Sequence, residues 1–496
     1  MERSNIPDCR NGFLIEPGQV DLIIEKALQV LEKSGARFES PRALKILKEN
    51  GAIVDFGTKR ARFKADLVRR SLETVPPGVV LYDREAQKSC VIGGSALNFA
   101  PGSSVVSVLD RDGRTIRPSL SLDMVLAARI CDKLPNISLQ STALVCNDIP
   151  NQLGDCFRLY LALKYSAKPV VTGAFSIPGL GVMRDLLAAV RGGYRLLEEK
   201  PMAIFDVCPS PPLKWSEISS SNIIDCARFK LPAQVVSLPM PGAASPVTLA
   251  GSLVVHIAEN LSGIVLSQCA NPGAPVIFGG APVQFDMRYG TTPFSAVEAV
   301  MIGAASASIG KALGLPTQTF AALSDSTVVD AQAGLETALG AAVAAQSDIN
   351  LVTGPGILSF AGCFSPEKLV IDDEICGMAL RLRRGIDFSP ECLAVELIER
   401  LGPGGVYLEE EHTYRWFKRE PYTPSKIIDR RSKSARDSEA KREILERAKE
   451  KIDLIITEKG GELPDGQVLS DLRSIVNRFA NEQGLENLFK DIKPGL

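Results

Sequence analysis

The sequence predicts an α/β protein built on a (β/α)8 TIM barrel. Short β-branched segments alternate with longer amphipathic segments from about residue 105 to residue 385. Several β-branched segments begin just after a proline, which ends a helix and can precede a strand. This repeated strand–helix unit favours a barrel. The alternative, an open doubly wound sheet, usually has a glycine-rich phosphate loop after its first strand, and CNDIPNQLGD there contains no such motif.

Seven segments are predicted to be parallel strands. In chain order they are ISLQSTALVC (137–146), KPVVTGAF (168–175), KPMAIFDV (200–207), LPAQVVSL (231–238), APVIFGGA (274–281), LPTQTFAAL (315–323) and INLVTGPG (349–356). SSVVSVLD (103–110) is the candidate for an eighth strand. Between them, segments such as GVMRDLLAAVRGGYRLLEE carry apolar residues at three- and four-residue steps, as a helix requires.

The flanks predict two further regions. We expect an N-terminal helical and short-strand extension over residues 1–102, the barrel over 103–405, and a C-terminal segment with a charged helical tail over 406–496. A DG turn predicts antiparallel strands within 79–118. The tail mixes acids and bases, so we expect a surface or subunit-contact helix rather than a nucleic-acid site. We also expect the chain to form a homo-oligomer.

The composition excludes several classes of function. With 45% hydrophobic residues, 23% charged residues and a net charge of −2, neither nucleic acid nor an anionic membrane is an expected partner. The chain shows no signal peptide and no predicted membrane span, so a cytoplasmic location is expected. The 11 cysteines form no CxxC pair and the two histidines have no catalytic or metal-binding context. We therefore expect reduced thiols and no metal site.

The candidate site is predicted at the carboxyl ends of the strands, where barrel enzymes place their chemistry. The segments there are rich in Gly, Pro, Ser and aromatic residues, which fits a quaternary ammonium held by cation–π attraction. Arg288 could bind the carboxylate of a betaine. The aromatic candidates are Phe99, Phe175, Phe205, Phe285, Tyr289, Phe294 and Phe360.

The segment DAQAGLET (330–337) joins a predicted strand to an alanine-rich helix. Asp325, Gln332 and Glu336 are polar candidates near this strand end, and Asp330 either faces the cation or caps the helix. Leu335, near the centre of the segment, can neither ionise nor bind a metal. No residue in this segment is therefore a certain catalytic group.

Five segments carry a resemblance to a known family: NFAPGSS, SLPMPGAASPVTLAG, FGGAPVQFDMRYG, DAQAGLET and EKLVIDDEICGMALRLRRGI. In order and spacing the chain resembles the trimethylamine methyltransferase (MttB) superfamily from about residue 15 to residue 430. The resemblance implies a TIM barrel and transfer of a methyl group to the cobalt of a partner corrinoid protein. It also implies that cobalamin is carried by the partner, with no cofactor bound tightly by this chain.

In the trimethylamine enzymes of that superfamily, a pyrrolysine occupies the position of Leu335. Members without it resemble glycine betaine methyltransferase, which points to methyl metabolism of a methanogenic or acetogenic type. A quaternary amine already carries the positive charge, so loss of methyl releases a neutral tertiary amine without a general acid. Leu335 would then be an apolar wall beside the methyl group. The alternatives are a barrel methyltransferase with a non-amine donor and a catalytically silent betaine-binding protein.

Overall fold

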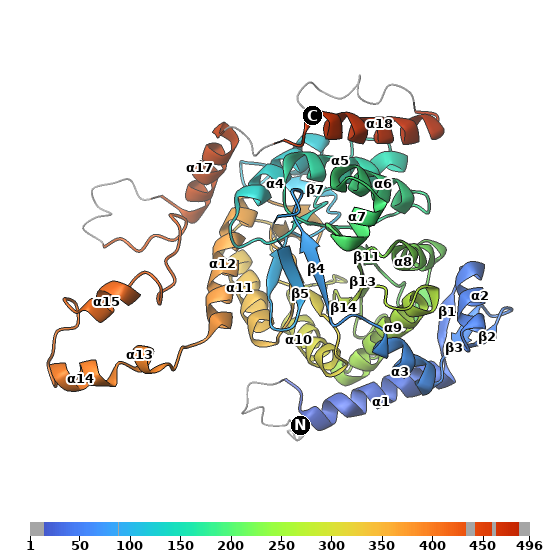
Figure 1. Cartoon of the computed structure of the whole chain (residues 1–496), viewed down its shortest axis with the longest axis horizontal. Helices are drawn as coiled ribbons and strands as arrows, with labels where there is room; N and C mark the ends of the chain where they lie inside the picture. Colours follow the sequence, from blue (N-terminus) through green and yellow to red (C-terminus); the bar gives the residue numbers. More distant parts are fainter. Residues whose placement is uncertain (1–13, 88, 433–441, 459–462, 486–496) are drawn as a thin grey trace.

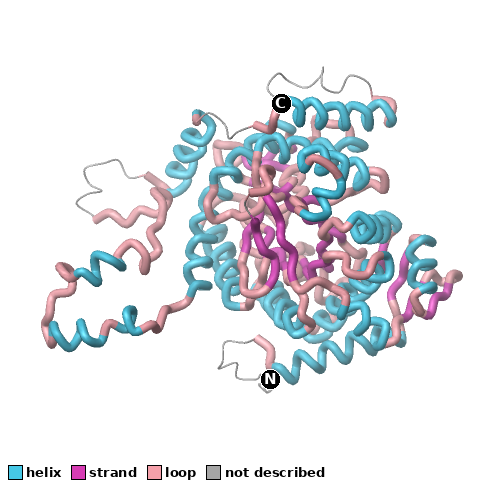
Figure 2. The backbone as a smooth tube through the Cα atoms, in the orientation of Figure 1, coloured by secondary structure: helices cyan, strands magenta, loops and turns pink. Residues whose placement is uncertain are grey.

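The computed structural model describes residues 14–87, 89–432, 442–458 and 463–485. Parallel strands lie at the centre of the body, and helices surround them (Figures 1 and 2). The first parallel sheet has the order β14–β13–β11–β10–β9, and the second has the order β15–β16–β6. Their strands are β6 (Asn98–Ala100), β9 (Gln140–Ser141), β10 (Val170–Thr172), β11 (Ala203–Val207), β13 (Ala233–Ser237), β14 (Val276–Gly280), β15 (Gln318–Phe320) and β16 (Leu351–Thr353).

The α/β class is confirmed, but the strands form two separate parallel sheets rather than the single closed sheet of the predicted barrel. Backbone hydrogen bonds cross between the sheets on both sides. Phe278 N donates to Pro316 O at 2.9 Å, and Ser138 N donates to Phe99 O at 2.9 Å. All seven predicted segments contain one of the parallel strands.

The prediction of an eighth strand at 103–110 was wrong in position. The parallel strand is β6, which ends directly before Pro101 and pairs with β16. Within the predicted segment, β7 (Ser107–Leu109) belongs to another sheet, where it pairs antiparallel with β8 (Ile116–Pro118) and parallel with β18 (Cys363–Phe364). A proline has no N–H for a ladder, so the chain changes sheets there. The fourth strand of that sheet is β17 (Ile357–Leu358).

Helices follow the parallel strands along the chain and cover the sheets. They are α4 (Ser121–Lys133), α5 (Gly154–Tyr165), α6 (Gly179–Arg191), α7 (Tyr194–Glu199), α8 (Glu217–Phe229), α9 (Leu249–Ala270), α10 (Val297–Ala312), α11 (Ala331–Gln346) and α12 (Pro366–Arg384), with a short 3-10 helix at Asn151–Leu153. Among the described residues, α9 alone is long and apolar enough to cross a membrane, and 72% of its most apolar window is buried inside the protein. Such burial is typical of a core helix.

A buried ion pair within α12 is hydrogen-bonded to α11. Lys368 Nζ on α12 lies 2.6 Å from Asp372 Oδ2 and donates to Thr337 Oγ1 on α11 at 2.8 Å. Asp372 Oδ2 also accepts the N–H of Gly356 at 2.7 Å. Both side chains of the pair are 1% exposed, so each charge depends on the other for compensation.

The N-terminal extension contributes three helices, a hairpin and three strands of a small sheet, whose fourth strand comes from the segment between β11 and α8. The helices are α1 (Pro17–Lys33), α2 (Pro41–Glu49) and α3 (Ala65–Glu73), and the sheet has the order β12–β1–β3–β2, with β1 (Ala36–Phe38), β2 (Ile53–Asp55), β3 (Arg60–Arg62) and β12 (Lys214–Trp215). Gly35 takes φ +69° where α1 turns into β1, and a Cβ there would lie 2.1 Å from Ala61 O. The turn therefore requires glycine.

The hairpin of β4 (Gly78–Tyr82) and β5 (Ser89–Gly93) closes one end of the parallel sheets. Its residues Val79, Leu81 and Ile92 pack in one apolar cluster with Leu139, Val171, Ile204, Ile277 and Leu351, which lie at or beside the starts of strands. The hairpin lies in front of the central strands in Figure 1. The opposite end of the strands is left for the site.

The C-terminal region leaves the body and returns to it. After α12 the chain forms α13 (Pro390–Leu393), α14 (Val395–Leu401) and α15 (Glu411–Trp416), then α17 (Ile444–Thr457) and α18 (Gly466–Glu482). Ala448 and Ile452 of α17 and Leu472 and Val476 of α18 are buried. The predicted charged helix is confirmed over α17, and its beginning at 433–441 lies outside the described residues.

Candidate active site

A cavity of about 410 Å³ lies at the carboxyl ends of the parallel strands. Its walls come from residues at or after the carboxyl ends of strands in both sheets. The hairpin packs at the starts of these strands, so the cavity lies at the opposite end. Its polar lining residues are Ser103, Ser104, Asp206, Ser216, Ser219, Asn222, Gln318 and Thr353, and its aromatic ones are Phe175, Phe294 and Phe320. Apolar and small residues complete the lining.

Asp206 is the single charged residue among the described residues that line the cavity. It is the fourth residue of β11, and the sheet register places it beside Gln234 of β13. Gln234 Nε2 donates a hydrogen bond to Asp206 Oδ1. Burial raises the pKa of Asp206 to about 7, although the hydrogen bond from Gln234 acts in the opposite direction. A bound cation would favour the carboxylate form.

Three phenyl rings line the same cavity. The rings of Phe294 and Phe320 meet edge to face with their centroids 5.4 Å apart. Phe175 comes from the loop after β10, and the residue is 61% exposed. A carboxylate together with phenyl faces provides both the charge and the quadrupole that attract a cation without N–H groups.

Phe175 is held by a buried ion pair behind it. Asp155 Oδ2 accepts the N–H of Phe175 at 2.6 Å, and Asp155 Oδ1 lies 3.2 Å from Arg158 NH2. The Arg158 guanidinium lies 5.4 Å from the centroid of the Phe175 ring. Burial lowers the pKa of Arg158, which is 1% exposed. Arg158 therefore supports the ring instead of lining the cavity.

Phe294 is held by the polar residues predicted near DAQAGLET. Asp325 Oδ1 and Oδ2 accept the N–H groups of Phe294 and Ser295 at 3.1 and 2.7 Å. Glu336 Oε2 in turn accepts the N–H of Asp325 at 2.8 Å and the hydroxyl of Ser324 at 2.6 Å. Burial raises the pKa of Asp325. These two carboxylates hold the loop that carries an aromatic wall.

Helix α8 begins at the cavity. Its N-cap, Ser216, accepts the N–H of Ser219 at 3.1 Å, and both hydroxyls line the cavity. Ile218, in the first turn, lines it as well. The positive end of a helix dipole and serine hydroxyls are favourable surroundings for an anionic group. The site thus presents a carboxylate, aromatic rings and a helix N-terminus.

Other predicted site residues lie outside the cavity lining. Phe99 and Phe205 are fully buried in the core, and Phe285 is partly buried in the loop after β14. Arg288 is exposed and lies 2.6 Å from Asp286 Oδ2, beside Tyr289, which is 77% exposed. Phe360 is partly exposed and precedes Ala361, which lines the cavity.

The remaining predicted residues belong to the start of α11. Asp330 caps this helix, because its Oδ1 accepts the N–H of Ala333 at 3.0 Å. Gln332 Nε2 donates to Glu336 Oε1 at 2.9 Å on the exposed side. Leu335 is 72% exposed and is not among the residues that line the cavity. Its assigned role beside the transferred methyl group remains a prediction.

Asp206, Phe320 and the serines of α8 were missed by the sequence-based choice of site residues. Side chains alternate between the two faces of a strand, so Phe205 and Asp206 point in opposite directions. The carboxylate of Asp206 inside the apolar segment AIFDV was the signal in the sequence that could have indicated a site residue, since a buried charge needs a compensating partner. Gln234 and Gln318 carry the same signal in their strands. Among the described residues, no cluster of three His, Cys, Asp or Glu side chains could hold a metal.

Comparisons with known proteins agree over most of the chain. A family model described as trimethylamine methyltransferase (MTTB) matches residues 4–484. Trimethylamine methyltransferase MttB of Desulfitobacterium hafniense is 31% identical over 92% of this chain and 92% of that protein. Glycine betaine methyltransferase of D. hafniense strain Y51 is 31% identical over 95% of this chain and 98% of that protein. Trimethylamine methyltransferase MttB2 of Methanosarcina mazei is 33% identical over 91% and 92%.

Solved structures show the same class of fold. The crystal structure of the hydroxylamine MtmB complex superposes with a TM-score of 0.50 and covers 95% of this chain and 93% of that chain. The sequence identity in that superposition is 12%. The likeness therefore concerns the fold alone.

Proposed function

We propose that this chain, which belongs to the trimethylamine methyltransferase family, moves a methyl group from a quaternary amine to the cob(I)alamin of a partner corrinoid protein. Glycine betaine or a related betaine is the proposed donor. The observation that carries the proposal is the position of Asp206, the single charged lining residue, in a cavity with three phenyl rings. The two parallel sheets would act together as the scaffold of a TIM barrel, in a cytoplasmic enzyme.

The cationic end of the donor would lie between Asp206 and the rings. A quaternary ammonium donates no N–H hydrogen bond, so Coulomb attraction and cation–π contacts are the available interactions. Each ring contributes about 0.5–2 kcal/mol to such a contact. A donor without the positive charge would lose both the Coulomb attraction to Asp206 and the cation–π contacts.

The carboxylate end of a betaine would lie at the N-terminus of α8. Ser216 and Ser219 line the cavity there, and their hydroxyl groups, which lie 2.9 Å apart, would be the donors to that carboxylate. The N-terminus of α8 would thus bind the carboxylate that was assigned to Arg288 from the sequence. The side chain of Arg288 is 80% exposed and pairs with Asp286. A zwitterion fits a cavity with an acid at one place and a helix N-terminus at another.

In the proposed step, the methyl group would leave the donor nitrogen for the cob(I)alamin that the partner corrinoid protein would supply. The N–CH₃ bond breaks, its electron pair stays on nitrogen, and a neutral tertiary amine is released. The corrinoid supplies the cobalt(I) nucleophile when the partner is bound. This chain's residues position the methyl group, exclude water and balance the charge of the donor. Asp206 needs to transfer no proton in this step.

The acceptor would reach the cavity from the strand-end side. Exposed apolar residues are present in the segments that follow the strands there. Val247, between β13 and α9, is 62% exposed, and Leu335, near the start of α11, is 72% exposed. Apolar residues of this kind suit contact with a protein partner.

The test is an assay for methylcobalamin formation. The purified chain is incubated with glycine betaine and a reduced corrinoid protein, and the corrinoid absorbance is followed. Methylcobalamin should accumulate with the wild-type chain and much more slowly with Asp206→Asn. If a panel of betaines gives no methylcobalamin while a methylated sulfonium compound does, the donor class is wrong. Calorimetric binding of betaines without turnover would identify a silent binding protein instead.

A further inference from the structure

Residues 386–421, which we call the arm, form a long excursion from the body. The arm contains α13, α14 and α15, and Figures 1 and 2 show it projecting away from the central strands and their helices. Its ends meet at the last turn of α12. Arg381 NH2 lies 2.7 Å from Glu420 Oε1, and Arg384 NH2 donates to Arg419 O at 2.8 Å.

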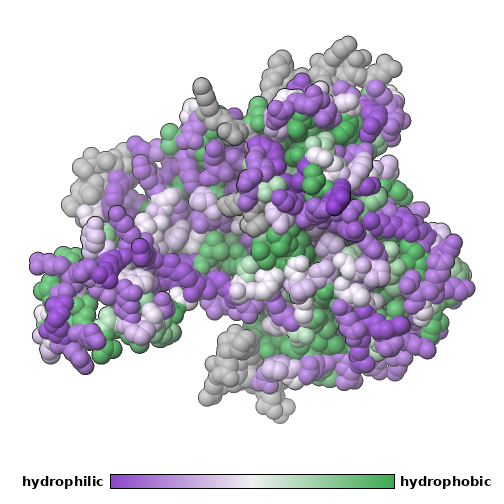
Figure 3. Space-filling view, viewed as in Figure 1, coloured by the Kyte–Doolittle hydropathy of each residue, from purple (hydrophilic) through white to green (hydrophobic). Residues whose placement is uncertain are grey.

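The arm has no core of its own. All of its residues are described, and none of them is buried. Figure 3 shows apolar side chains on the surface of the arm. Ordering each residue costs about 1–2 kcal/mol of backbone entropy, which a segment without apolar burial does not recover. Uncovered loops of this length are uncommon in compact domains. The most exposed apolar residues include Phe388, Val395, Ile398, Val406, Leu408 and Tyr414.

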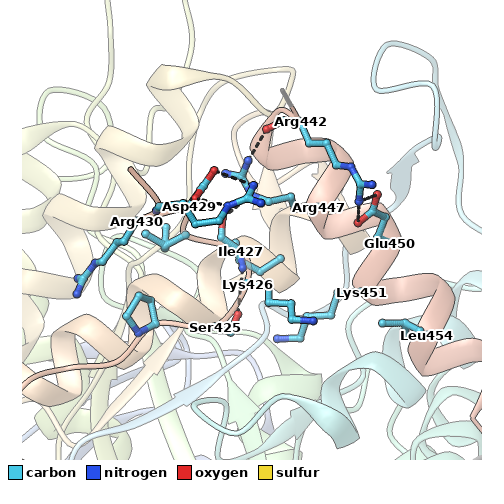
Figure 4. A pocket seen from close by; sticks show the side chains of 13 residues that line it. Ser425, Lys426, Ile427, Asp429, Arg430, Arg442, Arg447, Glu450, Lys451 and Leu454 are labelled. Carbon is cyan, nitrogen blue, oxygen red and sulfur yellow. Dashed lines mark hydrogen bonds and ion pairs between the residues drawn. The ribbon is translucent and has the colours of Figure 1, made fainter. Parts of the chain in front are cut away.

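A second feature lies where the arm rejoins the body. A cavity of about 680 Å³, which we call the basic groove, is formed by residues 424–431 and by α17 with the residue Arg442 before it. Figure 4 shows the cationic side chains around it. Asp429 and Glu450 are its acids, and Glu450 pairs with Arg442 at 2.7 Å. The cations are Lys426, Arg430, Arg431, Arg442, Arg447 and Lys451.

The arm and the basic groove carry opposite charges. The arm has eight acids and four bases, and the residues lining the groove include six bases and two acids. In the described part of the chain, neither Lys426 nor Arg430 forms an ion pair with the arm. Glu396, Glu399 and Glu409 are exposed on the arm. Their charges are therefore available to another molecule.

We propose that the arm packs on a second copy of this chain, with its acids in the basic groove of that copy, and that the exchange is reciprocal. A twofold dimer makes the same contact twice, so one arm and one groove per chain are sufficient. The apolar residues of the arm would supply the buried area, and the charges would set the register. The inference is independent of the reaction proposed above.

Complementary charge reversals test the exchange in the full-length chain. Variant A carries Glu396→Lys, Glu399→Lys and Glu409→Lys in the arm, and variant B carries Lys426→Glu and Arg430→Glu in the groove. Light scattering after gel filtration should give twice 53.3 kDa for the wild type and 53.3 kDa for each variant alone. In an equal mixture, both contacts of an A–B pair are complementary, so the dimer should return.

Two controls make the outcome decisive. Leu22→Asp changes an exposed leucine on α1, outside the arm, and should remain dimeric. Leu408→Asp, in the arm, should be monomeric with an unchanged circular dichroism spectrum. A monomeric wild type at micromolar concentration would overturn the proposal. So would variants A and B that remain dimers alone, or that stay monomeric when mixed.

Discussion

Asp325 and Phe294 are linked by a hydrogen bond of 3.1 Å from the backbone N–H of Phe294 to Asp325 Oδ1. Asp325 is held in the same way, because its own N–H donates to Glu336 Oε2 at 2.8 Å. Two carboxylates outside the cavity thus determine where an aromatic wall of the cavity stands. Asp325 and Glu336 therefore hold the loop of Phe294 and do not themselves line the cavity.

Glu336→Ala should weaken donor binding about tenfold, on the order of 1.4 kcal/mol, because it leaves the N–H of Asp325 without its acceptor and loosens the loop of Phe294. Calorimetry with the donor measures the effect. The matched control is Gln332→Ala, which removes the exposed hydrogen bond to Glu336 Oε1 and should change the affinity less than twofold. Equal affinities for Glu336→Ala and the wild type would refute the positioning role.

The pH dependence of kcat/KM should follow the ionisation of Asp206. Burial raises its pKa to about 7, so the unliganded site is largely neutral below that pH and negatively charged above it. We expect kcat/KM for the donor to rise with pH through a midpoint near 7 and then to level off. Asp206→Asn should give a lower and flat profile between pH 6 and 8. The same midpoint in both enzymes would assign the titration to another group.

Phe294→Leu should reduce donor affinity by about 2- to 30-fold, which corresponds to a loss of about 0.5–2 kcal/mol of cation–π attraction. The control ligand is 3,3-dimethylbutanoate, in which carbon replaces the charged nitrogen of glycine betaine. Its weaker binding should change much less, because it has no positive charge for the ring to attract. A parallel loss for both ligands would mean that Phe294 acts through packing alone.

Lys368→Met should lower the free energy of unfolding by about 3–5 kcal/mol, because it leaves the buried carboxylate of Asp372 without its counter-charge. Urea unfolding followed by circular dichroism measures the loss. Arg195→Met is the matched control, since it breaks an exposed ion pair with Glu199 and should cost less than about 1 kcal/mol. The double variant Lys368→Met/Asp372→Leu should recover part of the stability. Equal losses of unfolding free energy for Lys368→Met and Arg195→Met would show that burial of the Lys368–Asp372 pair contributes nothing.

The strand positions were predictable because each strand begins after a helix-ending proline or in a β-branched run. The exception, the segment 103–110, contains such a run but follows Pro101, which turns the chain away from the sheet that β6 joins. Partner choice between strands depends on contacts far apart in the sequence. For the same reason, the division of the strands into two sheets has no signal in the segments themselves.

The candidate site was predictable as a region and only partly by residue. Of the predicted aromatic residues, Phe175 and Phe294 line the cavity, because aromatic residues in strand-end loops have few other places to lie. The sequence points to Phe205 and not to Asp206 through aromatic type alone, which does not show on which face of the strand a side chain lies. Asp325 and Glu336 were recognised as important, but their partners, two backbone N–H groups of a distant loop, cannot be deduced from spacing.

The β4–β5 hairpin has a kinetic consequence for the proposed reaction. Because it seals the starts of the strands, the donor and the methyl acceptor must share the opening at the strand ends. A bound corrinoid protein would then block both entry of the amine and escape of its demethylated product. Steady-state kinetics should therefore be compulsory-ordered, with the donor first on and the tertiary amine last off. That amine should inhibit competitively against the donor and noncompetitively against the corrinoid protein.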